Sequence, residues 1–307
     1  ERTIIEFCCG DRSILGRPNP INARCARVRL TKRQDLSTSE GKRVALEAIS
    51  NAQRSNPGKV LLWASIPCTG GCPWNRINKG SPSARRKIAR HKKLFELLWS
   101  CFVECAEHAF RSGGCMVVIE WPQLCDYWGR RDVQNFLDRH GLRKTHFHGC
   151  MHGVCSVNRH TFGMPIKKPW SVASNTKHLA EVLGKTCDRS HDHARCQGVD
   201  TQRTEGYSEE IALRAHYAFA RYCDDARART PGGETRKGLV SIGEQVGDPA
   251  GDRGSNGARR AVAAACAVHA RLHEGLRALL LVPLAHPLSA ALPSPRCAMA
   301  SGGRTSV

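Results

Sequence analysis

The C-terminal part of the sequence lacks aromatic residues altogether. Every Trp, Tyr and Phe lies at or before Tyr222, and the chain beyond it is rich in Arg, Ala, Gly and Pro, with Lys237 as its only lysine. A segment of this composition cannot readily offset the entropy cost of ordering its backbone. We therefore predict that residues 226–307 form a low-complexity, mostly disordered tail, and an Ala-rich helix within it stays open as an alternative.

Long apolar runs are also missing. No stretch reaches the roughly 18 apolar residues that a membrane-spanning helix requires, which excludes a membrane span. No signal peptide is visible, and the first residue is Glu1 rather than Met, which favours a fragment of a longer protein. Several of the 16 Cys lie inside apolar runs, where free thiols pack as small hydrophobic groups. We expect an intracellular, reducing location, and the nucleus rather than the cytoplasm.

Acidic residues are scarce relative to basic ones. The sequence has 47 Lys and Arg against 27 Asp and Glu, a formal net charge of +20. Such an excess suits a polyanionic partner, nucleic acid above all. The densest basic stretch opens a predicted helix from Ala84, and "GMPIKKPW" adds a second one. A solvated helix face is the alternative; the predicted nucleic-acid contacts are Arg85, Arg86, Arg90, Lys92, Lys93, Lys167 and Lys168.

The order of apolar runs and amphipathic stretches predicts an α/β protein. Near-continuous apolar runs such as "GKVLLWASIP" and "CMVVIEWP" are typical of strands covered on both faces. They alternate with helical patterns over residues 40–53, 84–110 and 132–141, and "RKTHFHGCMHG" alternates like a further strand. This alternation predicts a Rossmann-like, mostly parallel sheet with helices on both faces. We expect that domain over residues 1–170, and a small zinc-bearing helical extension over residues 171–225.

Two chemically useful side chains follow predicted buried strands. Cys68 comes directly after Pro67 at the exit of one strand, and Glu120 ends the next. In a parallel sheet, ligands bind beyond the carboxyl ends of the strands. A thiolate there can attack an electrophilic ring carbon, and a partly buried carboxyl can donate a proton. We expect Cys68 rather than Cys72 to be the nucleophile, because Cys72 lies beyond two glycines. The alternatives for Cys68 are a metal ligand or a packing residue. The alternative for Glu120 is a carboxylate at a strand end that faces water.

The end of the first predicted strand carries groups suited to a nucleotide-like ligand. Gly10, Ser13 and Gly16 allow the backbone to approach a ligand closely, and the carboxylates of Asp11 and Asp35 can accept hydrogen bonds from ribose hydroxyls or an amine. An ordinary glycine turn is the alternative interpretation.

These motifs, "IIEFCCG", "DLS", "IPC" and "VIEWP" in this order, resemble the class I S-adenosylmethionine-dependent methyltransferases, and the Pro-Cys and Glu pair resembles the cytosine-5 methyltransferase arrangement. The resemblance implies Cys68 as nucleophile, Glu120 as acid and S-adenosylmethionine as cofactor. A closer likeness, carried by "PCTGG", "EWP", "FHGCM", "KKPW" and "TEGYSEEI", is to methyltransferase-like segments of dinoflagellate-type retroelement proteins. The resemblance implies that Phe7, Gly10 and Asp35 belong to the cofactor pocket. The full set of predicted cofactor-binding residues is Phe7, Cys8, Gly10, Asp11, Ser13, Asp35 and Pro67.

The sequence departs from that family in ways that keep an alternative open. Gly10 is the only glycine near Phe7, and neither a Gln-x-Arg-x-Arg motif nor a target-recognition domain is evident. A non-catalytic, zinc-stabilised nucleic-acid-binding remnant of a retroelement protein is therefore the alternative to methyl transfer onto a nucleic-acid base. A zinc deaminase fits less well, because Cys68 and Cys72 are spaced by three residues and no His-x-Glu precedes them.

A compact group of metal-ligating residues lies in "KTCDRSHDHARCQG". Cys187, His191, His193 and Cys196 offer four ligands within ten residues, which suits a tetrahedral, structural zinc ion. A polar loop that is rich in His by chance is the alternative. A second group, His146, His148, Cys150 and His152, would share one face of a continuous strand and could line a pocket or hold another metal, or simply be hydrogen-bonded.

Overall fold

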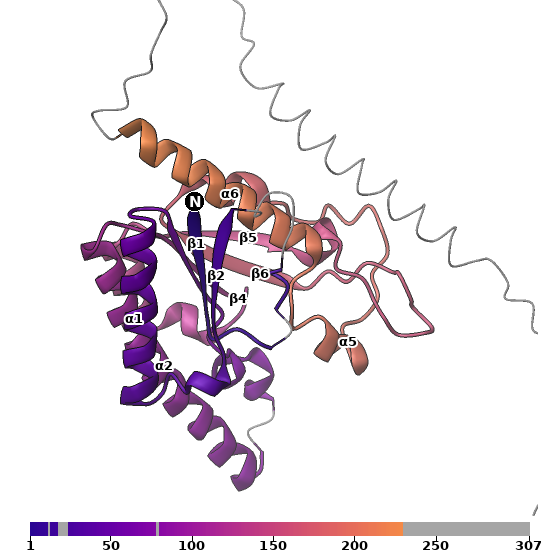
Figure 1. The fold of residues 1–307 in the computed structure, drawn as a ribbon. Helices are drawn as coiled ribbons and strands as arrows, with labels where there is room; N and C mark the ends of the chain where they lie inside the picture. The colour runs from indigo at the N-terminus through magenta and orange to yellow at the C-terminus, as the bar shows by residue number, and fades with distance from the viewer. Residues whose placement is uncertain (12, 18–23, 78–79, 230–307) are drawn as a thin grey trace, which may run out of the picture. The chain divides into compact units, whose positions relative to one another are not determined.

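A six-stranded sheet forms the centre of the fold that the described residues adopt (Figure 1). The computed structural model describes residues 1–11, 13–17, 24–77 and 80–229. The strand order is β2-β1-β3-β4-β6-β5, in which β6 is antiparallel to both of its neighbours and the other pairs are parallel. The predicted α/β class and mostly parallel sheet are thus confirmed. The strands are β1 (Arg2–Phe7), β2 (Cys25–Leu30), β3 (Val60–Ala64), β4 (Met116–Pro122), β5 (Arg143–His148) and β6 (Pro169–Ser174).

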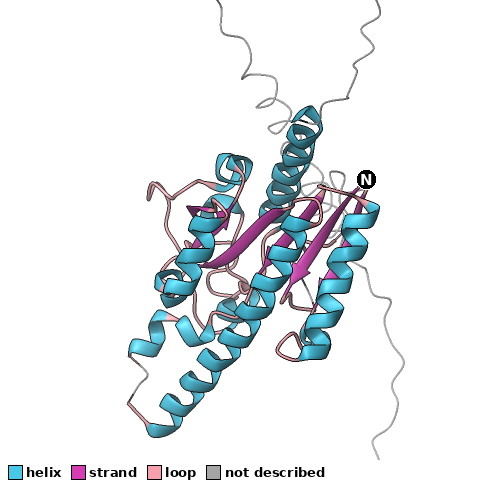
Figure 2. Ribbon diagram, turned by 90° about the vertical axis from the view of Figure 1, so that its left-hand side faces the viewer, coloured by secondary structure: helices cyan, strands magenta, loops and turns pink. Residues whose placement is uncertain are grey.

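Helices cover both faces of the sheet, as predicted, and each face has its own apolar core. Helices α1 (Ser39–Ser55), α2 (Pro82–Arg111) and α3 (Arg131–Arg139) pack on one face against alternate residues of β1, β3 and β4. Helices α4 (Lys177–Leu183) and α6 (Glu209–Arg229) pack on the other, and the short α5 (Val199–Arg203) precedes α6. Figure 2 shows these helices lying along the strands. Because successive residues of a strand point to opposite faces of the sheet, the apolar central strands contribute side chains to both cores.

The expected division at residue 170 is not observed. That position lies inside β6, which hydrogen-bonds to both β4 and β5, and α6 supplies Ile211, Ala215 and Phe219 to the core. Residues 171–225 therefore complete the sheet and its cover rather than forming an extension. The compact unit runs from Glu1 to Arg236. Helix α6 continues past residue 225 to Arg229, and the rest of the predicted tail lies outside the described residues.

The carboxyl ends of β1, β3 and β4 lie at the same edge of the sheet, because these strands are parallel. The chain reverses its direction of strand addition between β1 and β3, since β2 was added on the other side of β1. In open α/β sheets such a switch point is where ligands bind. Cys68 and Glu120, which the sequence analysis predicted as site residues, therefore belong to the carboxyl edge of the sheet, where ligands of open α/β proteins bind. No helix in the described part of the chain is long and apolar enough to cross a membrane.

Candidate functional site

A buried carboxyl lies near the carboxyl end of β4. The Glu120 side chain is on the α6 side of the sheet, and only 9% of the residue is exposed. Its Oε2 accepts a hydrogen bond of 2.9 Å from the Tyr207 hydroxyl, at the start of α6. Burial raises the pKa of Glu120 to about 7, against the opposing effects of the Tyr207 hydrogen bond and the Lys168 charge. At neutral pH this carboxyl can therefore act as a proton donor.

Tyr207 is held by β3 as well as by Glu120. Its hydroxyl accepts a hydrogen bond from Trp63 Nε1 at 2.9 Å and lies 2.7 Å from Ser65 Oγ. The Tyr207 ring also packs edge-to-face on the Trp63 indole, with ring centroids 5.5 Å apart. These contacts fix Tyr207 over two neighbouring strands, so the position of the Glu120 carboxyl is determined by side chains from β3, β4 and α6. No local sequence pattern points to Tyr207, because its hydrogen-bond partners are distant in the chain.

Cys68 begins the short 3-10 turn Thr69–Gly71 that follows β3. It is half-buried and packs against the core under α1 and α2. Burial, and next the Glu120 carboxylate, raise the pKa of Cys68 to about 11, whereas the Lys168 charge lowers it. The Glu120 carboxylate and the Lys168 charge thus have opposite effects on the pKa of the Cys68 thiol, and the pairing of Cys68 with Glu120 as nucleophile and acid stays a prediction. Cys72, also half-buried, lies beyond this turn.

Lys168 points into this region and not toward the surface, contrary to its predicted phosphate contact. Its Nζ donates a hydrogen bond to the Thr204 carbonyl and lies 4.6 Å from the centre of the Trp170 ring. Burial lowers the pKa of Lys168, and the Glu120 carboxylate opposes that shift. Lys168 has a left-handed backbone conformation, with φ 25°, directly before the first residue of β6. This conformation turns the Lys168 side chain inward. We call Ser65, Cys68, Glu120, Lys168 and Tyr207 the strand-end site.

The predicted cofactor residues divide into buried and accessible ones. Phe7 is fully buried, with its ring 5.5 Å from that of Phe102, so its side chain cannot line a ligand pocket. Cys8 packs against the same core in a left-handed conformation, φ 62°. Ser13 donates a hydrogen bond to the buried Glu6 carboxylate, which sequence reasoning missed. The accessible predicted residues are Gly10, Asp11, Asp35 and Pro67.

Asp35 follows β2 at the same edge of the sheet and is exposed. It has a left-handed backbone, φ 39°, and its Oδ1 accepts a hydrogen bond of 2.6 Å from Ser37. The next residues then cap α1, through a hydrogen bond of 3.0 Å from Gly41 N to Thr38 Oγ1. The sequence thus presents the Asp35 carboxylate to solvent on a short, well-anchored turn, with acceptor capacity remaining.

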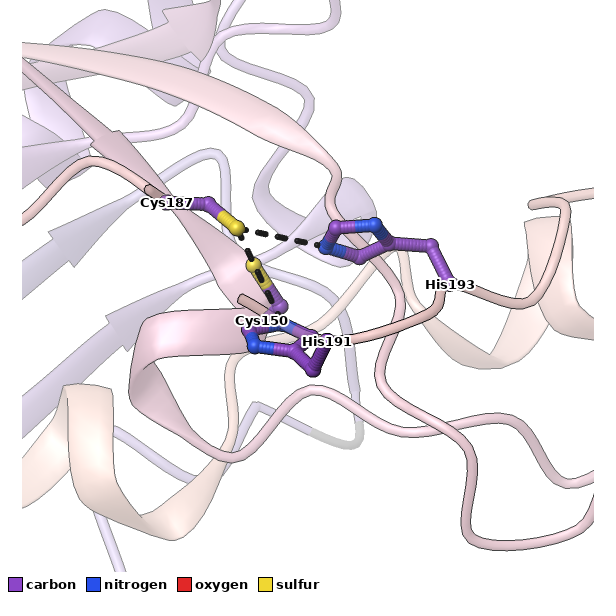
Figure 3. A group of neighbouring side chains, drawn as sticks. All are labelled: Cys150, Cys187, His191 and His193. Carbon is purple, nitrogen blue, oxygen red and sulfur yellow. Dashed lines mark hydrogen bonds between the residues drawn. The ribbon is translucent and has the colours of Figure 1, made fainter. Parts of the chain in front are cut away.

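Four metal-ligating side chains converge at a second place (Figure 3). Cys150, Cys187, His191 and His193 bring one ligand atom each within 4.8 Å of one another, so the cluster could hold a metal ion. Cys187 Sγ lies 3.8 Å from His191 Nε2 and 3.5 Å from His193 Nε2. A tetrahedral zinc site with ordinary bond lengths has S-to-N edges of about 3.6 Å. The two distances from Cys187 Sγ to the histidine nitrogens are thus close to those of such a site.

Backbone contacts hold these four side chains in place, and we call Cys150, Cys187, His191 and His193 the metal cluster. Arg189 N donates a hydrogen bond to Cys187 Sγ at 3.2 Å, from a left-handed backbone with φ 69°. Cys187 N donates to His148 Nδ1 at 2.8 Å, which ties the loop to the end of β5. Lys167 lies close by, because its carbonyl accepts a hydrogen bond of 2.7 Å from Gly149 N. Burial lowers the pKa of His148, and the charge of Lys167 lowers it further. These contacts connect the cluster to the sheet.

Three of the four predicted ligands belong to the cluster, but Cys196 does not. It is exposed, and its Sγ lies 3.4 Å from Thr204 Oγ1. The chain turns away from the cluster at the buried Ala194, whose N–H donates to the Pro165 carbonyl at 2.9 Å. The fourth ligand is Cys150, which the sequence placed in the other His-rich group.

That other group is not one face of a strand, because β5 ends at His148 and a 3-10 turn, Gly149–His152, follows. The turn directs Cys150 into the metal cluster. The three histidines of the group are hydrogen-bonded separately: His146 to Ser171 Oγ at 2.7 Å, His148 to Cys187 N, and the buried His152 to the Leu183 carbonyl at 2.9 Å. The shared strand face considered for this group is not observed, and the hydrogen bonds account for the three histidine rings.

The basic residues of α2 lie on the part of the helix that precedes its first buried residue, Phe95. Within the described residues, no ion pair is formed by Arg86, Arg90, Lys92 or Lys93 of this part of the helix, whereas Arg85 has partners of its own. Their charge is therefore available to an outside partner. The predicted contacts Arg85, Arg86, Arg90, Lys92 and Lys93 are all exposed.

Comparison with known proteins gives no relative on which to base an assignment. No protein-family model matches the chain, and no curated protein matches it either. The interpretation of the strand-end site and of the metal cluster therefore depends on the geometry described above.

Proposed function

We propose that the chain is an S-adenosylmethionine-dependent methyltransferase that acts on a nucleic-acid base, of the cytosine-5 type. One observation carries the proposal: Cys68 and Glu120 come from neighbouring parallel strands, close enough that the carboxylate raises the pKa of the thiol, and Glu120 has a pKa of about 7. These two groups would supply a nucleophile and a proton donor at the edge of the sheet where ligands of open α/β proteins bind.

The roles of the two groups follow from their chemistry. The Cys68 thiolate would add to a pyrimidine ring carbon, and the Glu120 carboxyl would give its proton to the ring nitrogen as the ring gains electron density. The bound cofactor would supply the methyl group. Lys168 would favour the thiolate, since its charge lowers the pKa of Cys68. Transfer of the proton from the methylated ring carbon to water, return of the ring-nitrogen proton to Glu120 and expulsion of the Cys68 thiolate would restore the aromatic base and the free enzyme.

The fit of the chain to the cofactor rests on the accessible residues at the switch point. The order β2-β1-β3-β4 matches that of doubly wound sheets, whose ligands lie between the first and third strands. There the exposed carboxylates of Asp11 and Asp35 would accept hydrogen bonds from hydroxyl or amino groups, and Gly10 leaves open space above the backbone. Phe7 and Cys8 would support this loop from the core.

A second candidate is a non-catalytic, zinc-stabilised nucleic-acid-binding remnant of a retroelement protein. The observation that favours it is the state of Cys68, whose pKa of about 11 leaves it a thiol at neutral pH. The carboxyl of Glu120 is likewise engaged by Tyr207. Both enzyme and remnant would bind nucleic acid through the basic part of α2, since neutralising phosphates requires exposed cations.

We propose zinc as the ion of the metal cluster in either case. Two Cys and two His form a closed tetrahedral set, which is typical of structural sites. Residues 184–198 have no helix or strand, and Ala194 is their only buried residue. Such a segment gains little from the apolar core, so metal binding would provide the free energy that orders it.

Calorimetry with S-adenosylmethionine separates the two candidates, because only the enzyme needs the cofactor. A covalent trap tests the chemistry: an oligonucleotide with a fluorinated pyrimidine should form an adduct with the wild type and with Cys72→Ser, but none with Cys68→Ser. Glu120→Gln should slow the adduct by about 100-fold or more, as expected for loss of a positioned acid. Cofactor binding without any adduct would exclude Cys68 as nucleophile, and absence of cofactor binding would favour the remnant.

A further inference from the structure

One tryptophan of the six is on the surface. Trp74 is 67% exposed, whereas the other five are at most 4% exposed. It lies in the 3-10 turn Pro73–Arg76, six residues after Cys68, and the nearby Ile77 is 73% exposed. A large apolar side chain held in water is an informative feature, because burying it would be favourable.

The turn that carries Trp74 is firmly attached. Asn75 Nδ2 donates a hydrogen bond of 2.7 Å to the Thr69 carbonyl, and Arg76 forms an ion pair of 2.5 Å with Asp126. Ile77 N closes the turn through a hydrogen bond of 3.1 Å to the Trp74 carbonyl. The exposed indole is therefore presented by an anchored backbone, as a rigid aromatic platform requires.

The sequence around this indole is uniformly basic. Residues 66–95 contain eight Lys and Arg and no Asp or Glu. On α2, residues 82–94 precede the first buried residue of the helix and extend over roughly 20 Å at 1.5 Å per residue. This segment carries positive charge and no acidic residue of its own, although Asp126 pairs with Arg76 beside it. Such a segment favours a polyanion, and the exposed indole adds a stacking partner for a base.

The basic part of α2 adjoins the Cys68 turn directly. Gly70 packs so closely on the helix that a Cβ there would lie 2.9 Å from Lys92 N and 3.0 Å from the His91 carbonyl carbon. A chain of phosphates lying along Arg86, Arg90 and Lys93 would therefore pass beside the turn that begins with Cys68.

We infer that Trp74 and the basic part of α2 bind single-stranded nucleic acid, with one base stacked on the Trp74 indole and the adjoining phosphates along α2. The inference rests on the proposed nucleic-acid function and adds the form of the strand. Stacking requires an unpaired, accessible base face, which a duplex does not offer in its interior, whereas cations alone bind either form.

Tryptophan fluorescence tests this on the full chain, because acrylamide reaches Trp74 and hardly the five buried indoles. The probe is a mixed-sequence single strand of about 12 nucleotides, as DNA and as RNA, and the same strand annealed to its complement. We expect at least one single strand to quench Trp74 and to shield it from acrylamide, and the duplexes to do neither. Trp74→Ala should bind that strand about 5- to 100-fold more weakly, and Trp74→Phe should lose less.

Two matched controls accompany these variants. Phe162→Ala removes an aromatic side chain that is 68% exposed elsewhere on the surface, and its affinity should equal that of the wild type. Arg86→Gln with Arg90→Gln should reduce the salt dependence of single-strand binding by about 1.4 in the log–log slope. The exposed pair Lys32→Gln with Arg33→Gln should leave that slope unchanged.

The outcomes separate the inference from the proposed function. If Trp74→Ala binds single strands as tightly as the wild type, the inference is wrong and nucleic-acid binding itself stands. If no DNA or RNA binds even at low salt, the inference and the nucleic-acid part of the proposed function both fail. If polyglutamate shields Trp74 as well as the single strand does, the surface fits an acidic protein, and the inference is overturned.

Discussion

The Tyr207 hydroxyl donates a hydrogen bond of 2.9 Å to the Glu120 carboxylate across 87 positions of sequence. This bond joins the start of α6 to β4 on the face of the sheet where Glu120 is buried. Because the hydroxyl donates, it favours the charged form of Glu120, while burial favours the neutral form and prevails. The protonation of this one carboxyl should therefore be visible in the stability of the whole chain.

Glu120 should make the protein less stable as the pH rises from about 4.5 to about 7. The folded state keeps the proton up to a pKa of about 7, while the unfolded chain loses it near 4.5. The folded state thus binds more protons in this window, and its stability falls there by up to about 3 kcal/mol. In urea unfolding experiments, the free energy of unfolding of Glu120→Gln relative to the wild type should rise by that amount as the pH increases between these values. Glu47→Gln, on the exposed face of α1, should gain nothing.

A Tyr207→Phe variant should shift the same window. Loss of the hydrogen bond removes an effect that lowers the pKa of Glu120, so the pKa should rise above about 7 and the decline in stability should extend to higher pH. The measurement is the same unfolding series. A profile identical to that of the wild type would show that Tyr207 does not determine the state of Glu120.

Alkylation of Cys68 should respond in opposite directions to two substitutions. The Glu120 carboxylate raises the pKa of the thiol and the Lys168 charge lowers it. At about pH 8, Glu120→Gln should therefore speed the reaction of Cys68 with iodoacetamide about threefold to tenfold, and Lys168→Met should slow it similarly. Peptide mass spectrometry gives the rates, with the exposed Cys155 of the same chain as internal reference. Equal rates in all three proteins would mean that the groups do not interact.

The zinc content should depend on Cys150 and not on Cys196. Protein prepared without chelator should carry about one zinc per chain, and Cys150→Ser or Cys187→Ser should lose most of it, since each removes a ligand. Cys196→Ser should keep it, because that thiol lies beside Thr204 instead. Elemental analysis of the three variants measures the zinc content. Loss of zinc in Cys196→Ser alone would show that the ligands are Cys187, His191, His193 and Cys196, as the sequence predicted.

Gly70 should tolerate no side chain, and Tyr127 should be part of the reason. A Cβ at Gly70 would meet the Tyr127 hydroxyl and the backbone at Lys92. Gly70→Ala should therefore destabilise the fold by about 1–3 kcal/mol. The buried Tyr127 hydroxyl has no hydrogen-bond partner among the described residues, so Tyr127→Phe alone should cost little stability. In that background the cost of Gly70→Ala should shrink; a double-mutant cycle with no coupling would contradict this packing.

The parts of the fold that the sequence predicted are those set by local pattern. Continuous apolar runs such as Val60–Ala64 and Met116–Pro122 are buried on both faces, and their strand character follows from composition alone. Strand β6 was missed because it starts at Pro169 after two lysines, so "KKPW" was interpreted as a basic surface motif. Its place between β4 and β5 depends on pairing partners at positions 118–122 and 143–148, which no local pattern reveals.

The site shows the same division. The positions of Cys68 and Glu120 at strand ends follow from the strands themselves, whereas the inward direction of Lys168 depends on an unusual φ and on Thr204. Likewise, the spacing in residues 187–196 indicated a loop whose side chains could hold a metal ion. It could not show that Ala194 is drawn to Pro165, which moves Cys196 away and leaves room for Cys150.

The antiparallel β6 has a consequence for the time course of synthesis. β4 and β5 do not pair with each other; each hydrogen-bonds to β6, which is made later. While the chain leaves the ribosome, β5 must therefore wait without a strand partner, and β4 keeps an open edge that another chain could occupy. The cover supplied by α6 arrives later still. The nascent chain thus passes through a stage in which its growing sheet is vulnerable to mispairing, and that stage ends only when residues 169–174 emerge and close the gap.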